Sequence, residues 1–157
     1  YSIDLGKRVA QGELDLAIMT ADPDGTSLHV ISEPLVWVAQ PEFAVHQRPL
    51  PVAVYHDACS VRRYGLAALR RDDIAHRISH SSNANSMLVT AVRGGHAIGV
   101  MPACTARHEG LFVVKNADLP QLPHIDIALK IRDQASPALR DLAVSAISAL
   151  GRENHAA

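Results

Sequence analysis

Apolar and polar residues alternate along the chain with two different periods, one helical and one extended. Residues 2–11 have apolar positions at helical spacing, with Ser2 at the expected N-cap and Gly12 suited to a left-handed helix end. Residues 13–18 then switch to a strict every-second-residue pattern, which predicts a strand. The polar, glycine-containing stretch 20–27 interrupts regular structure. The chain therefore opens with a helix followed by a strand.

The middle of the chain alternates apolar runs with amphipathic segments. Two runs, 35–40 and 51–55, are apolar on both faces, which is typical of strands covered by helices on both sides. From the second run onward the pattern is β-α-β-α-β. The predicted elements are a strand at 51–55, a helix at 61–71, a short strand at 76–79, a helix at 82–93 and a strand at 97–102.

The last part of the chain has the most strongly marked helix. Strands are predicted at 111–114 and 125–131, and a helix then starts with Ser136 as N-cap and Pro137 at the first helical position and is expected to end at Gly151. Strands alternating with helices of this length favour an α/β fold with mainly parallel sheets.

Composition limits the possible functions. The 157 residues are 48% hydrophobic, which is enough for the core of one domain or of two small lobes. The net charge of -1 provides no basic field for phosphates, so we expect no direct DNA binding by this chain. Because the chain begins with Tyr1 and a helical pattern follows at once, we interpret it as a piece of a larger protein; a processed N-terminus is the alternative.

Cysteine usage and hydropathy indicate a reducing, cytoplasmic location. Cys59 and Cys104 lie far apart and form no CxxC pair, which argues against a disulfide scaffold or a thiolate metal site. No apolar stretch reaches the length of a membrane span, and no export signal is recognisable at the start.

Polar residues gather where predicted strands lead into helices. In parallel sheets these junctions meet at one edge, where backbone N–H groups and helix dipoles converge. The junctions are Asp57 to Ser60, Ser81 to Asn83 and Pro102 to Thr105, and Thr20 follows an earlier strand. This arrangement predicts a site for a small polar or anionic ligand; the alternative is that the same residues only cap helices.

Three other chemistries are conceivable for this chain. His56 and Cys59 could form a nucleophilic pair, but no third residue is visible to orient the histidine. Cys59 and Cys104 could form a redox switch, since both follow strand ends. His76 and His80 are four residues apart, but they lie on a predicted strand without a metalloprotease motif. We therefore predict no catalytic residue, no metal and no cofactor.

Three segments together resemble a known family. "GELDLAI" at 12–18, "EPLVWVAQPE" at 33–42 and "AVRGGHAIGVMP" at 91–102 resemble the effector-binding domain of LysR-type transcriptional regulators in their order and spacing. The resemblance implies a two-lobed fold similar to type 2 periplasmic binding proteins, incomplete at its N-terminus, with a small effector held between the lobes. It also implies a dimer, and DNA binding only through a winged helix-turn-helix that would precede Tyr1.

The resemblance further implies domain limits and site residues. Lobe I would comprise 1–38 and 128–157, and lobe II would comprise 39–127. The expected effector contacts are Ser2, Thr20, Cys59, Ser60, Ser82 and Asn83. A free-standing solute-binding protein of the same fold, and an enzyme that uses Cys59 and His56, are the competing interpretations.

Overall fold

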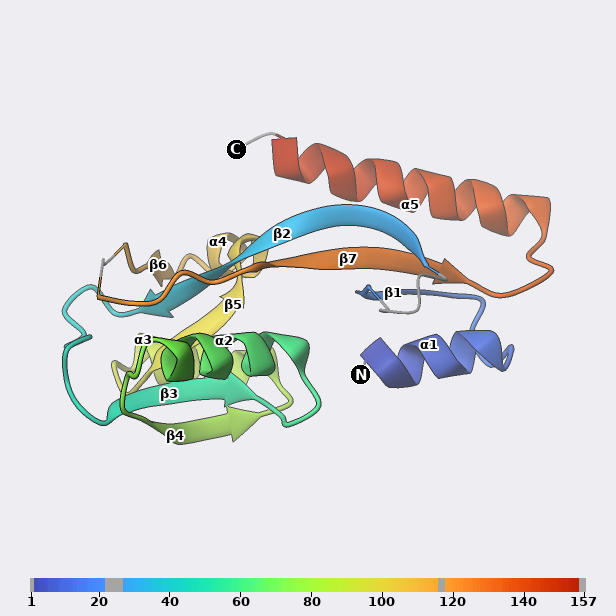
Figure 1. The fold of residues 1–157 in the computed structure, drawn as a ribbon. Helices are drawn as coiled ribbons and strands as arrows, with labels where there is room; N and C mark the ends of the chain where they lie inside the picture. The colour runs from blue at the N-terminus through green and yellow to red at the C-terminus, as the bar shows by residue number, and fades with distance from the viewer. Residues whose placement is uncertain (1, 22–26, 116–117, 156–157) are drawn as a thin grey trace. The chain divides into compact units, whose positions relative to one another are not determined.

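The computed structural model describes residues 2–21, 27–115 and 118–155, with the side chains of residues 2–3, 29–30 and 150–155 left out. The chain divides into two compact units. Unit 1 comprises Tyr1–Glu33 and Ile125–Ala157, and unit 2 comprises Pro34–His124. Figure 1 labels the helices and strands.

Unit 1 contains the beginning and the end of the chain. Helix α1 (Ser2–Ala10) leads into strand β1 (Leu16–Thr20) through Gly12, whose φ of 76° is the left-handed conformation that the sequence predicted. Strand β1 pairs antiparallel with β7 (His124–Ile131). Helix α5 (Pro137–His155) follows, and the Ser136 hydroxyl accepts a hydrogen bond from Leu139 N–H at 3.3 Å. The predicted N-cap of this helix is confirmed.

Unit 2 is built on the predicted β-α-β-α-β segment. Strand β3 is the middle one of three parallel strands, because it pairs in parallel with both β4 and β5. Strand β5 in turn pairs antiparallel with β2, and β6 pairs with β2 on the other side. The elements are β2 (Leu28–Ala39, which begins in unit 1), β3 (Leu50–Tyr55), α2 (Ser60–Arg71), β4 (His76–Ser82), α3 (Asn85–Arg93), β5 (Ile98–Pro102), α4 (Ala103–His108) and β6 (Phe112–Val113).

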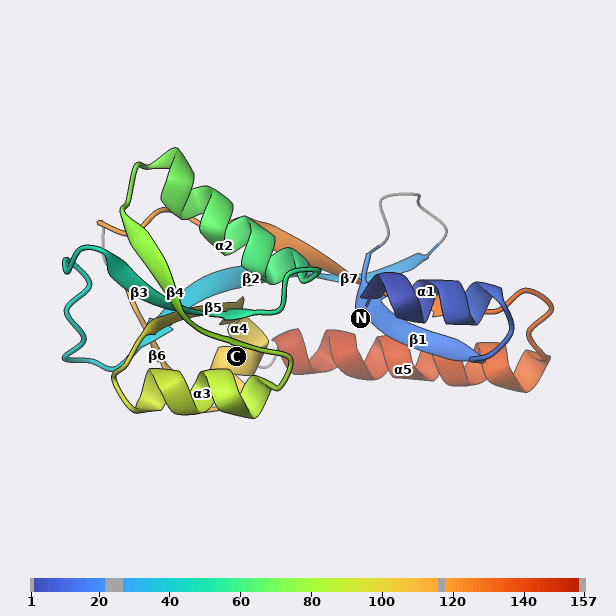
Figure 2. The ribbon, with the colours of Figure 1, turned by 90° about the horizontal axis from the view of Figure 1, so that it is seen from below.

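Helices α2 and α3 cover opposite faces of this sheet, as Figure 2 shows. A Cβ on Gly65 of α2 would lie 2.6 Å from the Val100 side chain, and a Cβ on Gly99 would lie 2.9 Å from Val92 of α3. Val100 and Gly99 are neighbours on β5, so their side-chain positions point to opposite faces. Both glycines therefore allow a helix to approach the strand closely.

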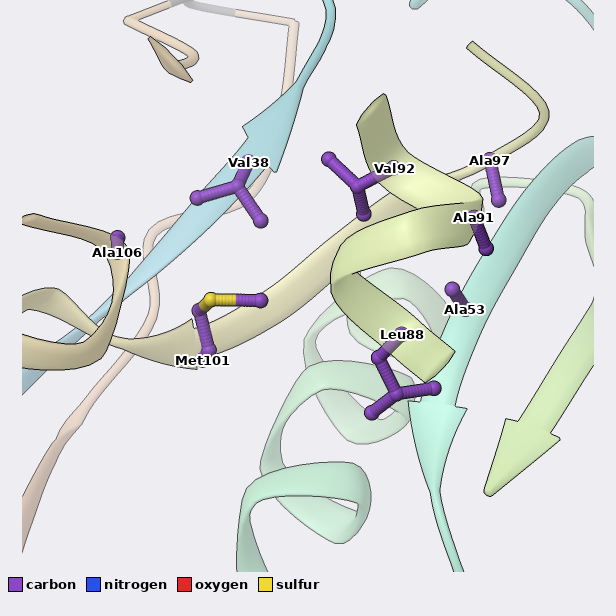
Figure 3. Packing of buried hydrophobic residues seen from close by; sticks show 8 residues of the cluster. All are labelled: Val38, Ala53, Leu88, Ala91, Val92, Ala97, Met101 and Ala106. Atoms are coloured by element: carbon purple, nitrogen blue, oxygen red, sulfur yellow. The ribbon is translucent and has the colours of Figure 1, made fainter. Parts of the chain in front are cut away.

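The core on the α3 face consists of small and medium-sized apolar side chains (Figure 3). Small residues on β3, α3, α4 and the start of β5 bring these elements close together, and Leu88 and Met101 fill the space between them. The buried members are Val38, Ala53, Leu88, Ala91, Val92, Ala97, Met101 and Ala106.

The structure corrects four sequence predictions. The sheets are not mainly parallel throughout, because β1 runs antiparallel to β7 and β2 runs antiparallel to β5. An apolar pattern predicts a strand but not the direction of its neighbours, so these antiparallel ladders could not be predicted from the pattern. The junction at Pro102 to Thr105 indicated a helix start, but no range was predicted for α4, because its six residues are too few to show a helical period. Helix α5 continues past Gly151 to His155, since a helix tolerates an isolated glycine.

The fourth correction concerns the start of α3. The sequence placed it at residue 82, but Ser82 is the last residue of β4, and α3 begins at Asn85 with Ala84 as its N-cap. The Ser82 hydroxyl accepts a hydrogen bond from Ala84 N–H at 3.0 Å, so it holds the connecting turn and does not cap the helix.

Candidate functional site: the strand ends of unit 2

Strands β3, β4 and β5 end at the same edge of the parallel part of the sheet, and polar side chains meet there. The turn after β3 is short and internally bonded: Cys59 N–H donates to His56 O at 3.0 Å, and Ala58 N–H donates to His56 Nδ1 at 3.2 Å. Cys59 is the N-cap of α2 and makes no side-chain capping bond. The N–H groups of the first turn of α2 are thus not satisfied by a side-chain cap.

Arg62, in the first turn of α2, ties the ends of two strands together. Its Nη1 donates to Tyr55 O at 3.0 Å and to Ser81 Oγ at 3.1 Å, and its Nη2 lies 2.6 Å from Asp57 Oδ1. The Arg62 side chain is only 16% exposed, whereas that of Asp57 is 90% exposed. The guanidinium group therefore fixes the β3 end, the β4 end and the intervening turn in one arrangement.

Tyr55 and Asn85 join the end of β3 to the start of α3. The Tyr55 hydroxyl donates to Asn85 Oδ1 at 2.8 Å, and Asn85 Nδ2 donates to Glu109 Oε1 at 3.3 Å. Glu109 follows α4 and also forms an ion pair with Arg93 at 3.6 Å. These bonds set the orientation of the Asn85 amide, since its oxygen faces a donor and its nitrogen faces an acceptor.

The environment of Tyr55 keeps its phenol protonated. Burial, and then the negative charges that Cys59, Glu109 and Cys104 carry at high pH, raise the pKa of Tyr55 to about 12. Tyr55 therefore remains a hydrogen-bond donor at neutral pH. The same interactions place both cysteines in the electrostatic surroundings of this phenol, and both are reduced thiols.

We call Tyr55, Arg62, Ser81, Asn85 and Glu109 the junction cluster. The sequence predicted a site at these junctions, but none of the six expected effector contacts belongs to the cluster. The sequence prediction did not include Tyr55, which has the pattern of an ordinary strand residue. It also did not include Arg62 and Glu109, which have the pattern of exposed charged residues on helices. Asn85 could have been recognised as a polar residue at the first position of α3. It was not, because the predicted start of this helix lay three residues too early.

The predicted site residues are distributed over both units. Cys59 and Ser60 lie at the start of α2, and Ser82 is the last residue of β4, close in sequence to the junction cluster. Asn83 is exposed. Thr20 is the last residue of β1 in unit 1, opposite Ile127. Ser2 is the first residue of α1, and its side chain lies outside the described residues.

The described residues contain no group of three or more histidine, cysteine, aspartate or glutamate side chains that could hold a metal ion. Of the two histidines considered from the sequence, His76 has its Nδ1 2.8 Å from Ile74 O, and His80 has its Nδ1 3.0 Å from Ser79 Oγ. None of the described helices has the length and apolarity needed to cross a membrane.

The sequence matches the profile of the LysR substrate binding domain over residues 2–149. The chain belongs to this family. It is an effector-binding domain of the kind found in LysR-type transcriptional regulators, and the fold predicted from the resemblance is confirmed. No curated protein sequence matches the chain.

Solved structures of LysR-type regulators share this fold. The regulatory domain of HypT from Salmonella typhimurium is 15% identical, with 98% of this chain and 80% of that chain covered and a TM-score of 0.79. The Synechocystis CcmR regulatory domain in complex with 2-PG is 16% identical, with 96% and 79% covered and a TM-score of 0.71. Vibrio fischeri DarR in complex with DNA is 18% identical, with 94% and 55% covered and a TM-score of 0.74.

Proposed function

We propose that this chain senses a small polar or anionic metabolite through the junction cluster, at the carboxyl edge of β3, β4 and β5. The observation that supports this most strongly is the meeting of the N-termini of α2 and α3 with Arg62, Tyr55 and Asn85 at one edge of the sheet. Neither helix has a side-chain cap, so their first-turn N–H groups can bind an acceptor-rich ligand.

The charge balance of the cluster favours a ligand that carries several hydrogen-bond acceptors. Arg62 is paired with Asp57, and Arg93 is paired with Glu109, so no unbalanced cation dominates. Backbone N–H groups, the side-chain amide of Asn85 and the hydroxyls of Ser60 and Ser82 supply the remaining polar contacts. Cys59, Ser60, Ser82 and Asn83 in unit 2, and Ser2 and Thr20 in unit 1, remain predicted effector contacts.

The wider role follows from the family. CcmR carries a small ligand in its regulatory domain, and DarR binds DNA as a longer chain. We infer that this chain is a non-enzymatic sensor in the cytoplasm, that it forms a homodimer, and that it acts on DNA through a separate DNA-binding domain. We also propose that units 1 and 2 correspond to the two lobes of the effector-binding domain, with limits near those drawn from the sequence.

A thermal-shift screen tests this function. The protein is melted with a panel of small metabolites that includes aliphatic and aromatic carboxylates, and a ligand present at about 100 times its dissociation constant should stabilise the fold by roughly 2.7 kcal/mol. Asn85→Ala should abolish the shift, whereas Gln47→Ala, an exposed residue of unit 2 outside the cluster, should retain it. A compound that stabilises wild type and Asn85→Ala equally would contradict the proposed site.

A further inference from the structure

Two histidines outside the junction cluster face each other on the α3 side of unit 2. His80 lies on β4, and His96 lies in the turn between α3 and β5. Their ring centroids are 6.3 Å apart, and the ring planes are inclined by 26°. The residues are 16 positions apart in sequence, so no local pattern brings them together. The fold itself creates this pair.

A bulge in β4 turns His80 toward this face. Val52 of β3 is opposite Ile78, but the next residue, Ala53, is opposite His80, so Ser79 is an extra residue in β4. Ala53 belongs to the buried cluster beneath α3. Because His80 is the register partner of Ala53, it lies on the α3 face. Without the extra residue, Ser79 would occupy that position.

The bulge also fixes which nitrogen of His80 is available. The Ser79 hydroxyl donates its proton to Val52 O at 3.2 Å, and the same oxygen lies 3.0 Å from His80 Nδ1. Since that proton is already directed at Val52, the hydroxyl oxygen must accept from His80 Nδ1–H. This arrangement corresponds to the Nδ1–H tautomer of neutral His80, in which Nε2 carries the lone pair that a metal ion requires.

Glycine at position 94 makes room for the second ring. A Cβ at Gly94 would lie 2.8 Å from His96 Cδ2 and 2.9 Å from His96 Nε2. The imidazole of His96 therefore occupies the space that any other side chain at the end of α3 would fill.

We propose that His80 and His96 together bind a divalent transition-metal ion such as Ni²⁺, Zn²⁺ or Cu²⁺, with water completing its coordination. Imidazole nitrogens bind these ions at about 2.0–2.1 Å, which places each ring centroid about 3.2 Å from the ion. Two rings on one ion therefore have centroids at most about 6.4 Å apart. The observed 6.3 Å lies just within this limit. The rings are stacked in this structure, so at least one of them has to turn about its side-chain torsions before both can bind the same ion.

The ion would connect β4 to the turn that precedes β5. Because the ion binds the folded arrangement and not the separated histidines, it should stabilise unit 2. This site is independent of the proposed effector site, which uses none of these residues.

Isothermal titration of the untagged, chelator-free protein with NiCl₂ tests the proposal. We expect one ion per chain at this site, and binding at least ~10-fold weaker in both His80→Ala and His96→Ala, because removing even an outer partner of a metal ligand has an effect of that size. His108→Ala, an exposed histidine of α4, is the matched control and should bind like wild type. Circular dichroism without metal checks that each variant folds.

Two results would overturn the proposal: no Ni²⁺ binding by wild type, or unchanged binding in His96→Ala, which alters an exposed side chain. The double variant His80→Ala/His96→Ala distinguishes one shared metal site from two independent sites. If both histidines hold the same ion, the double variant should bind no more weakly than either single variant. Additive losses would mean that each histidine binds a separate ion.

Discussion

The Tyr55 hydroxyl donates to Asn85 Oδ1 across 2.8 Å and so joins the last residue of β3 to the first residue of α3. Because Asn85 also donates to Glu109 beyond α4, one amide connects the ends of three elements. Its orientation is therefore determined by the fold before any ligand arrives. Preorganised polar groups of this kind lower the cost of ordering a site on binding.

Replacing Asn85 with alanine should destabilise the protein by about 1–2 kcal/mol, because the half-buried phenol of Tyr55 and the Glu109 carboxylate each lose a partner. Urea unfolding measures the change. Asn83→Ala is the matched control, since Asn83 is exposed, and it should stay within about 0.5 kcal/mol of wild type. Equal effects of the two substitutions would mean that the Asn85 bonds do not contribute to stability.

Arg62→Ala should cost roughly 1–3 kcal/mol, because it leaves the Tyr55 carbonyl and the Ser81 hydroxyl without their charged donor. Arg70→Ala changes an exposed arginine of the same helix and should have little effect. Chemical denaturation of both variants makes the comparison. A similar loss in Arg70→Ala would point to helix propensity or net charge as the cause.

Gly65→Ala should destabilise the protein even though alanine favours helices over glycine by about 1 kcal/mol. The new methyl group would lie 2.6 Å from Val100 Cγ1, and overpacking of this kind costs roughly 1–3 kcal/mol. Thermal unfolding should show a lower melting temperature. The double variant Gly65→Ala/Val100→Ala should lose less stability than the two single changes added together, and strict additivity would argue against the clash.

The Tyr55 phenol should titrate near pH 12 in the folded protein, as seen in the ultraviolet difference between wild type and Tyr55→Phe. Since its pKa is raised on folding, its contribution to stability is complete below about pH 10 and is lost as pH rises toward 12. Glu109→Gln should lower this pKa, because it removes a negative charge near the phenol. An unchanged pKa in that variant would exclude Glu109 as a cause.

Ser136→Ala should destabilise α5 by about 1 kcal/mol, since it removes the oxygen that accepts Leu139 N–H. Ser145→Ala lies at an exposed position within the same helix and serves as control, with no loss expected because alanine is the better helix former. Helicity and thermal unfolding followed by circular dichroism distinguish the two.

Local patterns in the sequence were sufficient for most elements. Ser136 and Gly12 have short-range roles, a cap and a left-handed turn, and both were predicted correctly. No range was predicted for α4, because six residues show no clear period. The antiparallel ladders were missed because strand direction depends on how the chain returns and not on residue pattern.

The region of the proposed site could be predicted from the sequence, but Tyr55, Arg62 and Asn85 could not. Parallel strands bring their carboxyl ends together, so the junctions themselves could be located from the sequence. The hydrogen-bond partners could not be predicted, because Arg62 and Ser81 are 19 positions apart in the sequence and Asn85 and Glu109 are 24 positions apart. Such contacts depend on the distance between α2, β4 and α4 in the folded chain. The bulge at Ser79, which redirects His80, was likewise invisible in the sequence.

The central claim is that an effector binds at the junction cluster, and ¹⁵N–¹H correlation spectra recorded during a titration test it most directly. The titrant is the compound that gives the largest thermal shift. If the effector binds there, the amide signals of Ser60 to Arg62 and of Asn85 and Ser86 should move most, because these N–H groups begin α2 and α3. Saturable binding that leaves both groups of signals in place would contradict the account.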